Sequence, residues 1–505
     1  MFDGTRRLGE ALNTVGRFCS EDFAIIQRLV NFVTLNASPD NTALSTVLSN
    51  VATRELGLDF DAITGWGRDS VKVNGTATNR LLVIFPSSVD LLCICHTLNN
   101  TGDRVGFPEK REFMTSWLTL VQNNNAAKQL WKSLASQAIV GFSNIRWWSR
   151  QEVENEICLN FGLLPSFLAQ LESDGVGDAT TKKMASVYAK DPLRLEVSFA
   201  AGYDGTLQLL RTTYELEGDR LEILLVYRRV EALRAFGRSL QEDEGNRGLL
   251  PNVDAVIRRA SQPALGLKVR KEFAGHGTFT RTISKIDVED PDEPVYHIVY
   301  EDGDRETMVD AELCPLLEVY GGEMRKYAVQ ELVGAFIYLE NRLTGNCDRS
   351  YDCSQGYELC RVIQLFDPSY VASHPSIDSS SVQQLSVITP LARGNYGKLL
   401  RELEGELPTY KVAVIGFQCD HSDVSAFTSA VLAWWAQNAK ELPKWSSAAR
   451  ICFSFSPNSC ACERVFSLLK EMFGEDQDNC LADYLQAALM LRYNKRLQTC
   501  NMFIQ

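Results

Sequence analysis

Apolar side chains fill both alternating positions of residues 23–35, a pattern typical of a strand that is buried on both faces. A second extended run precedes the polar residues 20–22, so we predict two strands joined by a turn. A helix follows, because apolar residues recur at the spacing of one helical face: Leu44, Val47, Leu48 and Val51. Gly57 is expected to end this helix, since glycine readily adopts the left-handed conformation of a helix terminus.

Three further elements are predicted before residue 100. A short strand is expected over residues 62–66, a helix over 74–82 and a strand over 89–96. The resulting order is two or three β-runs, then helix, strand, helix and strand. Alternation of this kind favours an α/β fold for the first part of the chain.

The character of the sequence then changes several times. Residues 115–260 have the periodicity of amphipathic helices, whereas 266–317 consist of short β-type runs broken by glycine and proline, which is typical of a small barrel. Helical sequence returns at 326–342. We interpret 346–386, which are rich in Cys, Ser, Asp and Pro, as loop, and 426–496 as mostly helical.

Length and composition indicate an ordinary globular protein with more than one core. The chain has 505 residues, of which 45% are hydrophobic and 23% charged, and two to four domains are expected at this length. No apolar run approaches the ~20 residues of a membrane span, so we expect no membrane contact. The given N-terminus does not resemble a secretory leader, which favours the cell interior. Most of the 14 cysteines are therefore expected to be reduced and buried.

The net charge of −13 argues against a general binder of polyanions. The charge is uneven, because residues 1–150 hold 15 Lys and Arg against 13 Asp and Glu, while the rest of the chain is strongly acidic. Any surface that faces DNA is therefore expected in the first part of the chain.

The C-terminal region carries the most specific motif. Trp434-Trp435 and Leu442-Pro443-Lys444-Trp445 precede a small-residue turn and the helix-like run Glu463-Arg464-Val465-Phe466-Ser467. This arrangement resembles the C-terminal dimerisation region of hAT-superfamily DNA transposases. The resemblance implies self-association through five candidate residues: Trp434, Trp435, Phe466, Leu485 and Leu489. The alternative for each of them is packing inside one protomer.

The resemblance also implies a fold class and a domain order. The expected fold is an α/β, RNase H-like core split by a mainly α-helical insertion, which itself carries a small all-β barrel. We expect the core in residues 1–150 and 396–505, the insertion in 151–264 and, with loop, in 318–395, and the Tudor-like barrel in 265–317. hAT proteins carry a BED-type zinc finger ahead of the core; the given sequence contains no such finger, and no structural zinc is predicted.

Three acids stand where the hAT pattern places its catalytic, metal-binding residues. Asp3 is expected at the end of the first strand, Asp69 after the fourth, and Glu463 at the start of the Glu-Arg-Val-Phe-Ser helix. Such carboxylates would hold two Mg²⁺ or Mn²⁺ ions about 3.5–4 Å apart while a phosphodiester bond is attacked. We therefore expect the three side chains to converge, although any one of them alone is typical of a surface acid.

Two further elements resemble hAT features near DNA. Cys93 and His96 match a Cys-x-x-His element, which implies a histidine beside the scissile phosphate and a cysteine that shapes the site. Arg146 and Trp147 match an Arg-Trp element, which implies a phosphate contact and a ring that stacks on a flipped base. The alternatives are a buried cysteine with a hydrogen-bonded histidine, and a core tryptophan.

The barrel segment resembles Tudor-like or chromo-barrel modules. Residues 265–317 hold 6 Lys and Arg against 12 Asp and Glu, and an acidic aromatic cage could bind a methylated lysine of a histone tail through cation–π contacts. The candidate cage residues are Phe273, Phe279, Tyr296 and Tyr300. The alternative is that these rings form the core of the barrel.

Three functions remain open at this point. The first is a transposon-derived nuclear protein that dimerises and has weak or no transposition activity, which we expect because strand one is short ahead of Asp3 and no zinc finger is seen. The second is an active DDE-type transposase that cuts and joins DNA with two metal ions. The third is a chromatin reader that acts through the barrel.

Overall fold

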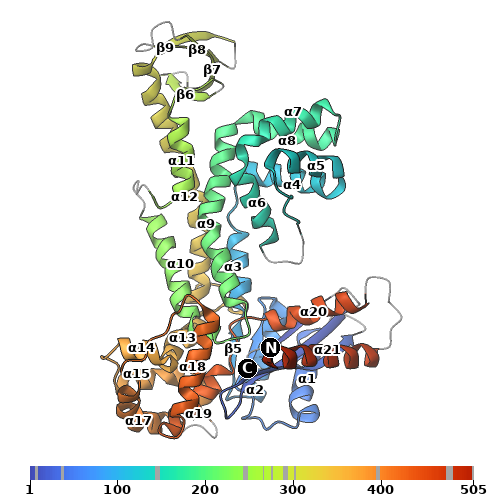
Figure 1. Ribbon diagram of the computed structural model, residues 1–505, viewed down its shortest axis with the longest axis vertical. Coiled ribbons are helices and arrows are strands. Elements are labelled where there is room, and N and C mark those ends of the chain that lie inside the picture. Colours follow the sequence, from blue (N-terminus) through green and yellow to red (C-terminus); the bar gives the residue numbers. More distant parts are fainter. Residues whose placement is uncertain are drawn as a thin grey trace. The chain divides into compact units, whose positions relative to one another are not determined.

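The computed structural model describes residues 1–5, 10–35, 39–142, 148–242, 248–265, 267–273, 277–287, 294–300, 303–393, 398–473 and 482–502 (Figure 1). The chain forms two compact units. Unit 1 comprises Met1–Leu98, Arg211–Ala232 and Leu339–Gln505, and unit 2 comprises Asn99–Leu210 and Leu233–Tyr338. The first segment of unit 1 thus ends at Leu98, earlier than the expected boundary at residue 150.

Unit 1 contains two small sheets. β1 (Phe2–Thr5), β2 (Glu10–Cys19) and β3 (Ile25–Leu35) form an antiparallel sheet in the order β1-β2-β3, which confirms the predicted pair of strands around residues 20–22. β4 (Gly65–Arg68) and β5 (Val89–Leu92) pair in parallel. β4 lies slightly later than the strand expected over 62–66.

Helices pack on both faces of the three-stranded sheet, because side chains alternate between its faces. α1 (Asn41–Asn50), which continues as a π-helical turn over Val51–Glu55, and α2 (Lys72–Ile84) cover one face, where Phe2 and Leu12 are buried. α20 (Cys460–Phe473) and α21 (Ala482–Met502) cover the other, where Ala11 and Val15 are buried. Gly57 has a φ of +62°, as its predicted role at the helix end requires.

Two predictions of local structure in unit 1 are wrong. The strand expected over 89–96 ends at Leu92, and α3 (Ile94–Gly102) begins two residues later. The segment interpreted as loop over 346–386 contains α13 (Ser354–Val362), α14 (Pro368–Ser373) and α15 (Ser379–Gln383). Its Asp and Pro residues are helix starts: Asp367 and Asp378 cap α14 and α15, and Pro368 opens α14.

An aromatic core holds the C-terminal helices of unit 1 together. It joins α17 (Leu399–Ala413), α18 (Val424–Asn438) and α19 (Pro443–Phe453). Trp435 and Trp445 are fully buried, and their indole N–H groups donate to the carbonyl oxygens of Phe366 and Leu403, both at 3.0 Å. The short helix α16 (Thr389–Ala392) precedes this group.

Unit 2 is mainly helical, as the periodicity of residues 115–260 predicts. Trp117 and Trp131 lie in its core, with ring centroids 4.8 Å apart. The helices around this core are α4 (Pro108–Asn123), α5 (Asn125–Ala135), α6 (Ser149–Leu159), α7 (Leu164–Ser173) and α8 (Asp178–Lys190). α11 (Pro251–Ala260) belongs to the same unit, and the unit boundaries fall within α3, α9 (Pro192–Leu216), α10 (Val226–Gln241) and α12 (Asp310–Thr344).

Unit 2 also contains the predicted β-type segment. β6 (Lys268–Phe273), β7 (Gly277–Asp287), β8 (Val295–Tyr300) and β9 (Arg305–Val309) pair in sequence order as an antiparallel meander. Its core includes Ile283 and Ile298, and it continues into α12 through Leu313 and Leu317. The strands are confirmed, while the described residues include no pairing of β9 with β6 that would close a barrel.

A cavity of about 470 Å³ lies in unit 1 alongside Met1. Residues 16–18 of β2 and 65–67 of β4 line it. β1 has four residues whereas β2 has ten, so β1 covers only part of the length of β2. Separately, none of the helices in the described part of the chain combines the length and apolar character that a membrane span needs.

Candidate active site

Asp3 lies on the face of the sheet that carries α20. It alternates with Phe2, whose side chain is buried on the opposite face. Asp3 pairs with Asn13 of β2, and the side-chain amide of Asn13 donates to the carbonyl oxygen of Cys462 at 3.0 Å. The sequence led us to expect Asp3 at the end of the first strand. It is instead the second residue of the four-residue strand β1.

Asp69 directly follows β4, as predicted. Its Oδ1 accepts hydrogen bonds from the backbone N–H of Val71 at 3.0 Å and from the side-chain amide of Asn74 at 2.6 Å. The buried Arg68 pairs with Asp90 at 2.8 Å and donates to the carbonyl oxygen of Asp69 at 3.0 Å. These contacts fix both the backbone and the carboxylate of Asp69.

Glu463 lies in the first turn of α20. The turn before this helix is held by Asn458, whose amide donates to the carbonyl oxygens of Leu216 at 2.6 Å and Gly218 at 3.1 Å. Asn458 Oδ1 in turn accepts from the N–H of Cys460 at 3.0 Å. The buried amide of Asn458 therefore sets the direction in which α20 leaves the turn.

His96 and Cys93 lie between β5 and the first turn of α3. Nε2 of His96 is 3.5 Å from Oε1 of Glu463, and its Nδ1 is 3.3 Å from the hydroxyl of Ser459. The N–H of Ser459 points at the sulfur of Cys93, 3.3 Å away. Because His96 is helical rather than part of a strand, its ring extends from the helix start toward α20.

The pKa values of two of the acids depend on charges from the other elements of the site. Burial and the negative charge of Asp69 raise the pKa of Asp3 to about 7. Burial raises the pKa of Glu463 to about 8; His96 opposes this shift, while Cys93, Asp3 and Asp69 add to it. The charge of Asp69 thus acts on both Asp3 and Glu463, although the three residues come from β1, the end of β4 and the start of α20.

The pKa values of His96 and Cys93 are shifted in opposite directions, in part by each other. Burial by itself would lower the pKa of His96, but the negative charges of Cys93, Glu463 and Asp69 outweigh it and raise the pKa to about 10. Burial would likewise raise the pKa of Cys93, but a hydrogen bond from Cys95 and the charge of His96 hold it well below the ordinary value of a thiol. The pair therefore favours an imidazolium next to a thiolate.

The donor set fits divalent cations of the hard kind. Three carboxylates supply the oxygen ligands that Mg²⁺ and Mn²⁺ prefer. Burial raises the pKa values of Asp3 and Glu463, and a bound cation would favour their charged forms. Within the described residues, the ligand atoms of the three acids do not all lie within 4.8 Å of one another.

The remaining candidates for DNA contact cannot be placed. Arg146 and Trp147 lie outside the described residues. The neighbouring Trp148 is buried in unit 2, where its ring packs against Gly102, and its own φ of +58° is unusual for a bulky residue.

The candidate aromatic cage is not supported by the two tyrosines. Tyr296 is buried in the core of the meander, and its hydroxyl donates to Asp310 at 2.7 Å. The Tyr300 hydroxyl bonds to Glu306. The side chains of Phe273 and Phe279 lie outside the described residues. Tyr296 is therefore a core residue, which corrects its assignment to an open cage.

The candidate dimerisation residues are packed inside unit 1. Trp434 and Trp435 belong to its aromatic core, Leu485 and Leu489 are buried against the sheet, and Phe466 is partly buried there. The repeating apolar pattern marked these positions but could not distinguish a protomer core from an interface. Among the described side chains of α21, the large apolar ones that are exposed are instead Tyr484 and Leu491, at 61% and 65% exposure.

Sequence reasoning missed the residues that support the acids. Asn74, five positions after Asp69, holds that carboxylate, and Ser459 contacts both His96 and Cys93. In the sequence, only the nearness of these two residues to Asp69 and Glu463 could have pointed to them. Their roles depend on contacts that the fold brings about, and a local pattern does not show those contacts.

Comparison with known proteins gives a match in the C-terminal part. Residues 419–494 match the family model of the hAT family C-terminal dimerisation region. The match spans α18 to α20 and much of α21, and thus includes Glu463. No curated protein matches the chain. The matched region supports a relationship of this chain to the hAT family of transposable elements, together with self-association through its C-terminal part.

Proposed function

We propose that this protein is a self-associating, hAT transposase-like protein whose acidic site binds two divalent metal ions and acts on phosphodiester bonds of DNA. The observation that carries the proposal is the approach of His96 to Glu463, at 3.5 Å, beside two acids, Asp3 and Asp69, whose charges raise the pKa of Glu463 further. Buried carboxyl groups with strongly raised pKa values are typical of functional sites.

In this proposal, the residues of the site have different roles. Asp3, Asp69 and Glu463 would hold the ions, which lower the pKa of an attacking water and neutralise charge on the phosphate. His96, with its raised pKa, would remain protonated at neutral pH and could donate to a phosphate oxygen. Asn74 and Asn13 would position Asp69 and the start of α20. DNA as a substrate implies a nuclear location.

A cleavage assay tests the catalytic proposal. Linear and hairpin duplexes are incubated with the full chain and Mn²⁺, and Glu463→Gln is compared with Glu471→Gln, an exposed glutamate later in the same helix. We expect Mn²⁺-dependent cleavage that falls by at least about 100-fold in Glu463→Gln, since metal ligands must be held precisely in place, and that persists in Glu471→Gln. Equal rates in both variants would contradict the proposal.

Self-association is tested separately. Leu491 on α21 is exposed, apolar and within the matched region, so we expect Leu491→Glu to weaken association measured by light scattering. Leu159→Glu is the matched control, because Leu159 is 68% exposed but belongs to unit 2. A monomer at all concentrations of the unchanged chain would contradict this part.

The two tests also separate the second candidate. A protein that associates but leaves DNA uncut would be a transposon-derived interaction factor. This outcome would agree with the expectation, drawn from the sequence, of weak or no transposition. That expectation stays a prediction until the cleavage assay is done.

A further inference from the structure

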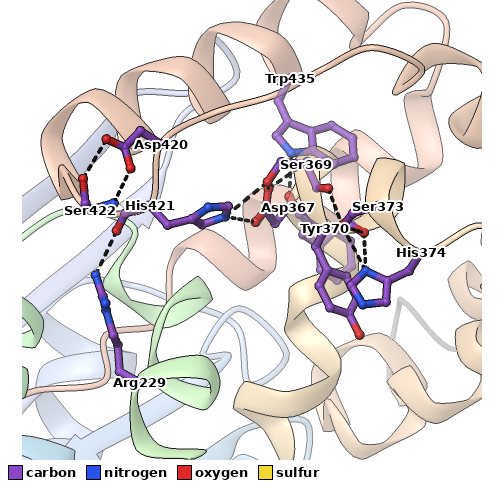
Figure 2. A network of polar contacts seen from close by, with 11 residues as sticks. Arg229, Asp367, Ser369, Tyr370, Ser373, His374, Asp420, His421, Ser422 and Trp435 are labelled. Atoms are coloured by element: carbon purple, nitrogen blue, oxygen red, sulfur yellow. Dashed lines mark hydrogen bonds and ion pairs between the residues drawn. The ribbon is translucent and has the colours of Figure 1, made fainter. Parts of the chain in front are cut away.

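A second cluster of potential metal ligands lies in unit 1, and the acidic site does not use it. Asp367, Cys419 and His421 each offer one ligand atom, and these three atoms all lie within 4.8 Å of one another. Asp367 is 4% exposed at the start of α14, and the other two residues come from the segment between α17 and α18. Figure 2 shows the ring of His421 directed at the carboxylate of Asp367.

The local backbone explains why the cysteine and the histidine share one side. The segment before α18 is non-helical, and alternate residues of an extended chain point the same way. The intervening Asp420 bonds instead to the N–H and hydroxyl of Ser422, at 2.8 and 2.6 Å (Figure 2). A Cys-x-His segment therefore presents sulfur and nitrogen together to Asp367.

The hydrogen bonds of this cluster leave Oδ2 of Asp367 and Nε2 of His421 facing each other. Oδ1 of Asp367 accepts from the backbone N–H and the hydroxyl of Ser369, at 2.9 and 2.7 Å. Oδ2 lies 2.9 Å from Nε2 of His421, and the Ser369 hydroxyl lies 3.2 Å from the same nitrogen. One ring nitrogen thus meets two oxygens, whereas a bond to a metal would use its lone pair.

The surroundings hold these groups in place. Arg229 donates to the carbonyl oxygen of His421 at 2.9 Å and pairs with Glu215 at 2.8 Å. The His421 ring packs on Phe427, with centroids 4.9 Å apart. The carbonyl of Phe366, next to Asp367, accepts from the indole of the buried Trp435 at 3.0 Å. Outer contacts of this kind orient the ligands of metal sites.

From this geometry we propose that Asp367, Cys419 and His421 form a binding site for Zn²⁺ or a similar transition metal ion. One thiolate, one imidazole and one carboxylate suit zinc and do not suit Mg²⁺ or Ca²⁺. In a tetrahedral zinc site nitrogen and oxygen ligands lie about 3.3 Å apart, so Oδ2 and Nε2 need to separate only slightly. Water or the Ser369 hydroxyl would complete the coordination.

The position of the site suggests what the metal does. The match to the dimerisation region begins at residue 419. The contact of His421 with Asp367, 54 positions earlier in the chain, connects the start of this region to α14. A bound ion would therefore clamp the segment that leads into α18. It would act on stability and on the geometry of the C-terminal region, independently of the acidic site.

The first experiment measures binding to the full chain. The reduced protein is freed of metal with a chelator and titrated with Zn²⁺ or Co²⁺ alone. We expect a tight zinc equivalent, a raised thermal midpoint, and thiolate-to-cobalt charge-transfer absorption. These signals should disappear in Cys419→Ala and weaken by more than about 100-fold in His421→Asn.

Two controls make the result specific. His374→Asn changes a neighbouring histidine that bonds to Ser373 and the carbonyl of Tyr370 (Figure 2), and Cys93→Ser removes the thiol beside the acidic cluster; both should keep the signal. The Cys419→Ala site is only partly buried and non-helical, so this variant is expected to fold. Cobalt absorption that persists in Cys419→Ala, or no zinc-dependent shift in the unchanged chain, would overturn the proposal and leave a purely hydrogen-bonded network.

Discussion

At the scale of single residues, the candidate active site depends on amides as much as on acids. Asp69 is held by Asn74, and the start of α20 is held by Asn13 and Asn458. Buried amides of this kind are costly unless paired, and once paired they fix a geometry. The acids are the candidate metal ligands, and the amides hold Asp69 and the start of α20 in position.

The first prediction concerns Asn74. Replacing it with alanine removes the 2.6 Å hydrogen bond to Asp69, so we expect Mn²⁺ affinity, measured by titration of the purified chain, to fall by about 10–100-fold. Asn79→Ala on the exposed face of the same helix is the control and should bind as the unchanged chain does. If both variants bind equally well, Asn74 does not position a metal ligand.

The second prediction concerns pH in the absence of metal. Glu463 has an ordinary pKa of 4.5 and a pKa of about 8 in the folded protein. Between these values the folded state holds a proton that the unfolded state has lost, so the free energy of unfolding falls as pH rises from about 4.5 to about 8. The raised pKa values of Asp3 and His96 act with the same sign.

Glu463→Gln removes that ionisation. We expect urea midpoints measured in a chelator at pH 5, 6.5 and 8 to decline less steeply in this variant than in the unchanged chain. Glu471→Gln, on the exposed side of α20, should retain the original slope. Identical slopes in all three proteins would refute the assigned shift of Glu463.

At the scale of elements, the strand that carries Asp3, β1, is only four residues long. The N-terminal ammonium donates to the carbonyl oxygen of Val15 at 2.9 Å, and burial lowers its pKa. The cavity of about 470 Å³ lies beside it, between β2 and β4. The cavity therefore leaves room for further residues beside the strand that carries Asp3.

The third prediction follows from this cavity. Joining five residues of alternating valine and threonine to the N-terminus would extend β1 along β2 and move the ammonium away from the core. We expect a higher thermal midpoint, because apolar area is buried and further backbone hydrogen bonds form. An extension of five glycine and serine residues is the matched control, and an equal effect of both extensions would show that the cavity does not accept a strand.

At the scale of the whole molecule, the two compact units have separate cores. The β-meander of unit 2 does not form its core alone, because Leu313 and Leu317 of α12 complete it. The sheet and the first turns of that helix are therefore one folding group. The sequence-based end of the β-segment, residue 317, coincides with Leu317, the last residue of this shared core.

The fourth prediction tests this grouping. A fragment of residues 265–322 should give a dispersed amide spectrum, whereas one of residues 265–309 should not, since it lacks both leucines. Leu313→Ala in the longer fragment should cost about 2–5 kcal/mol of stability. Folding of the shorter fragment would show that the meander is independent of α12.

The sequence by itself predicted most of the local elements, and the resemblance to hAT proteins singled out the three acids as candidates. Periodicity located the strands around residues 20–22, the helix after Pro39 and the β-segment of unit 2, because these depend on neighbours along the chain. The C-terminal motif identified Glu463, and the match over residues 419–494 supports the same relationship.

Only the tertiary structure decided which of these residues meet. The charge of Asp3 contributes to the raised pKa of Glu463 across almost the whole chain, and Asp367 and His421 meet across 54 positions. Likewise, Trp435 and Leu489 have the same apolar character whether they face a partner or a core, and packing alone places them inside the protomer. Contacts between distant segments arise from the burial of several elements together, which a local pattern does not encode.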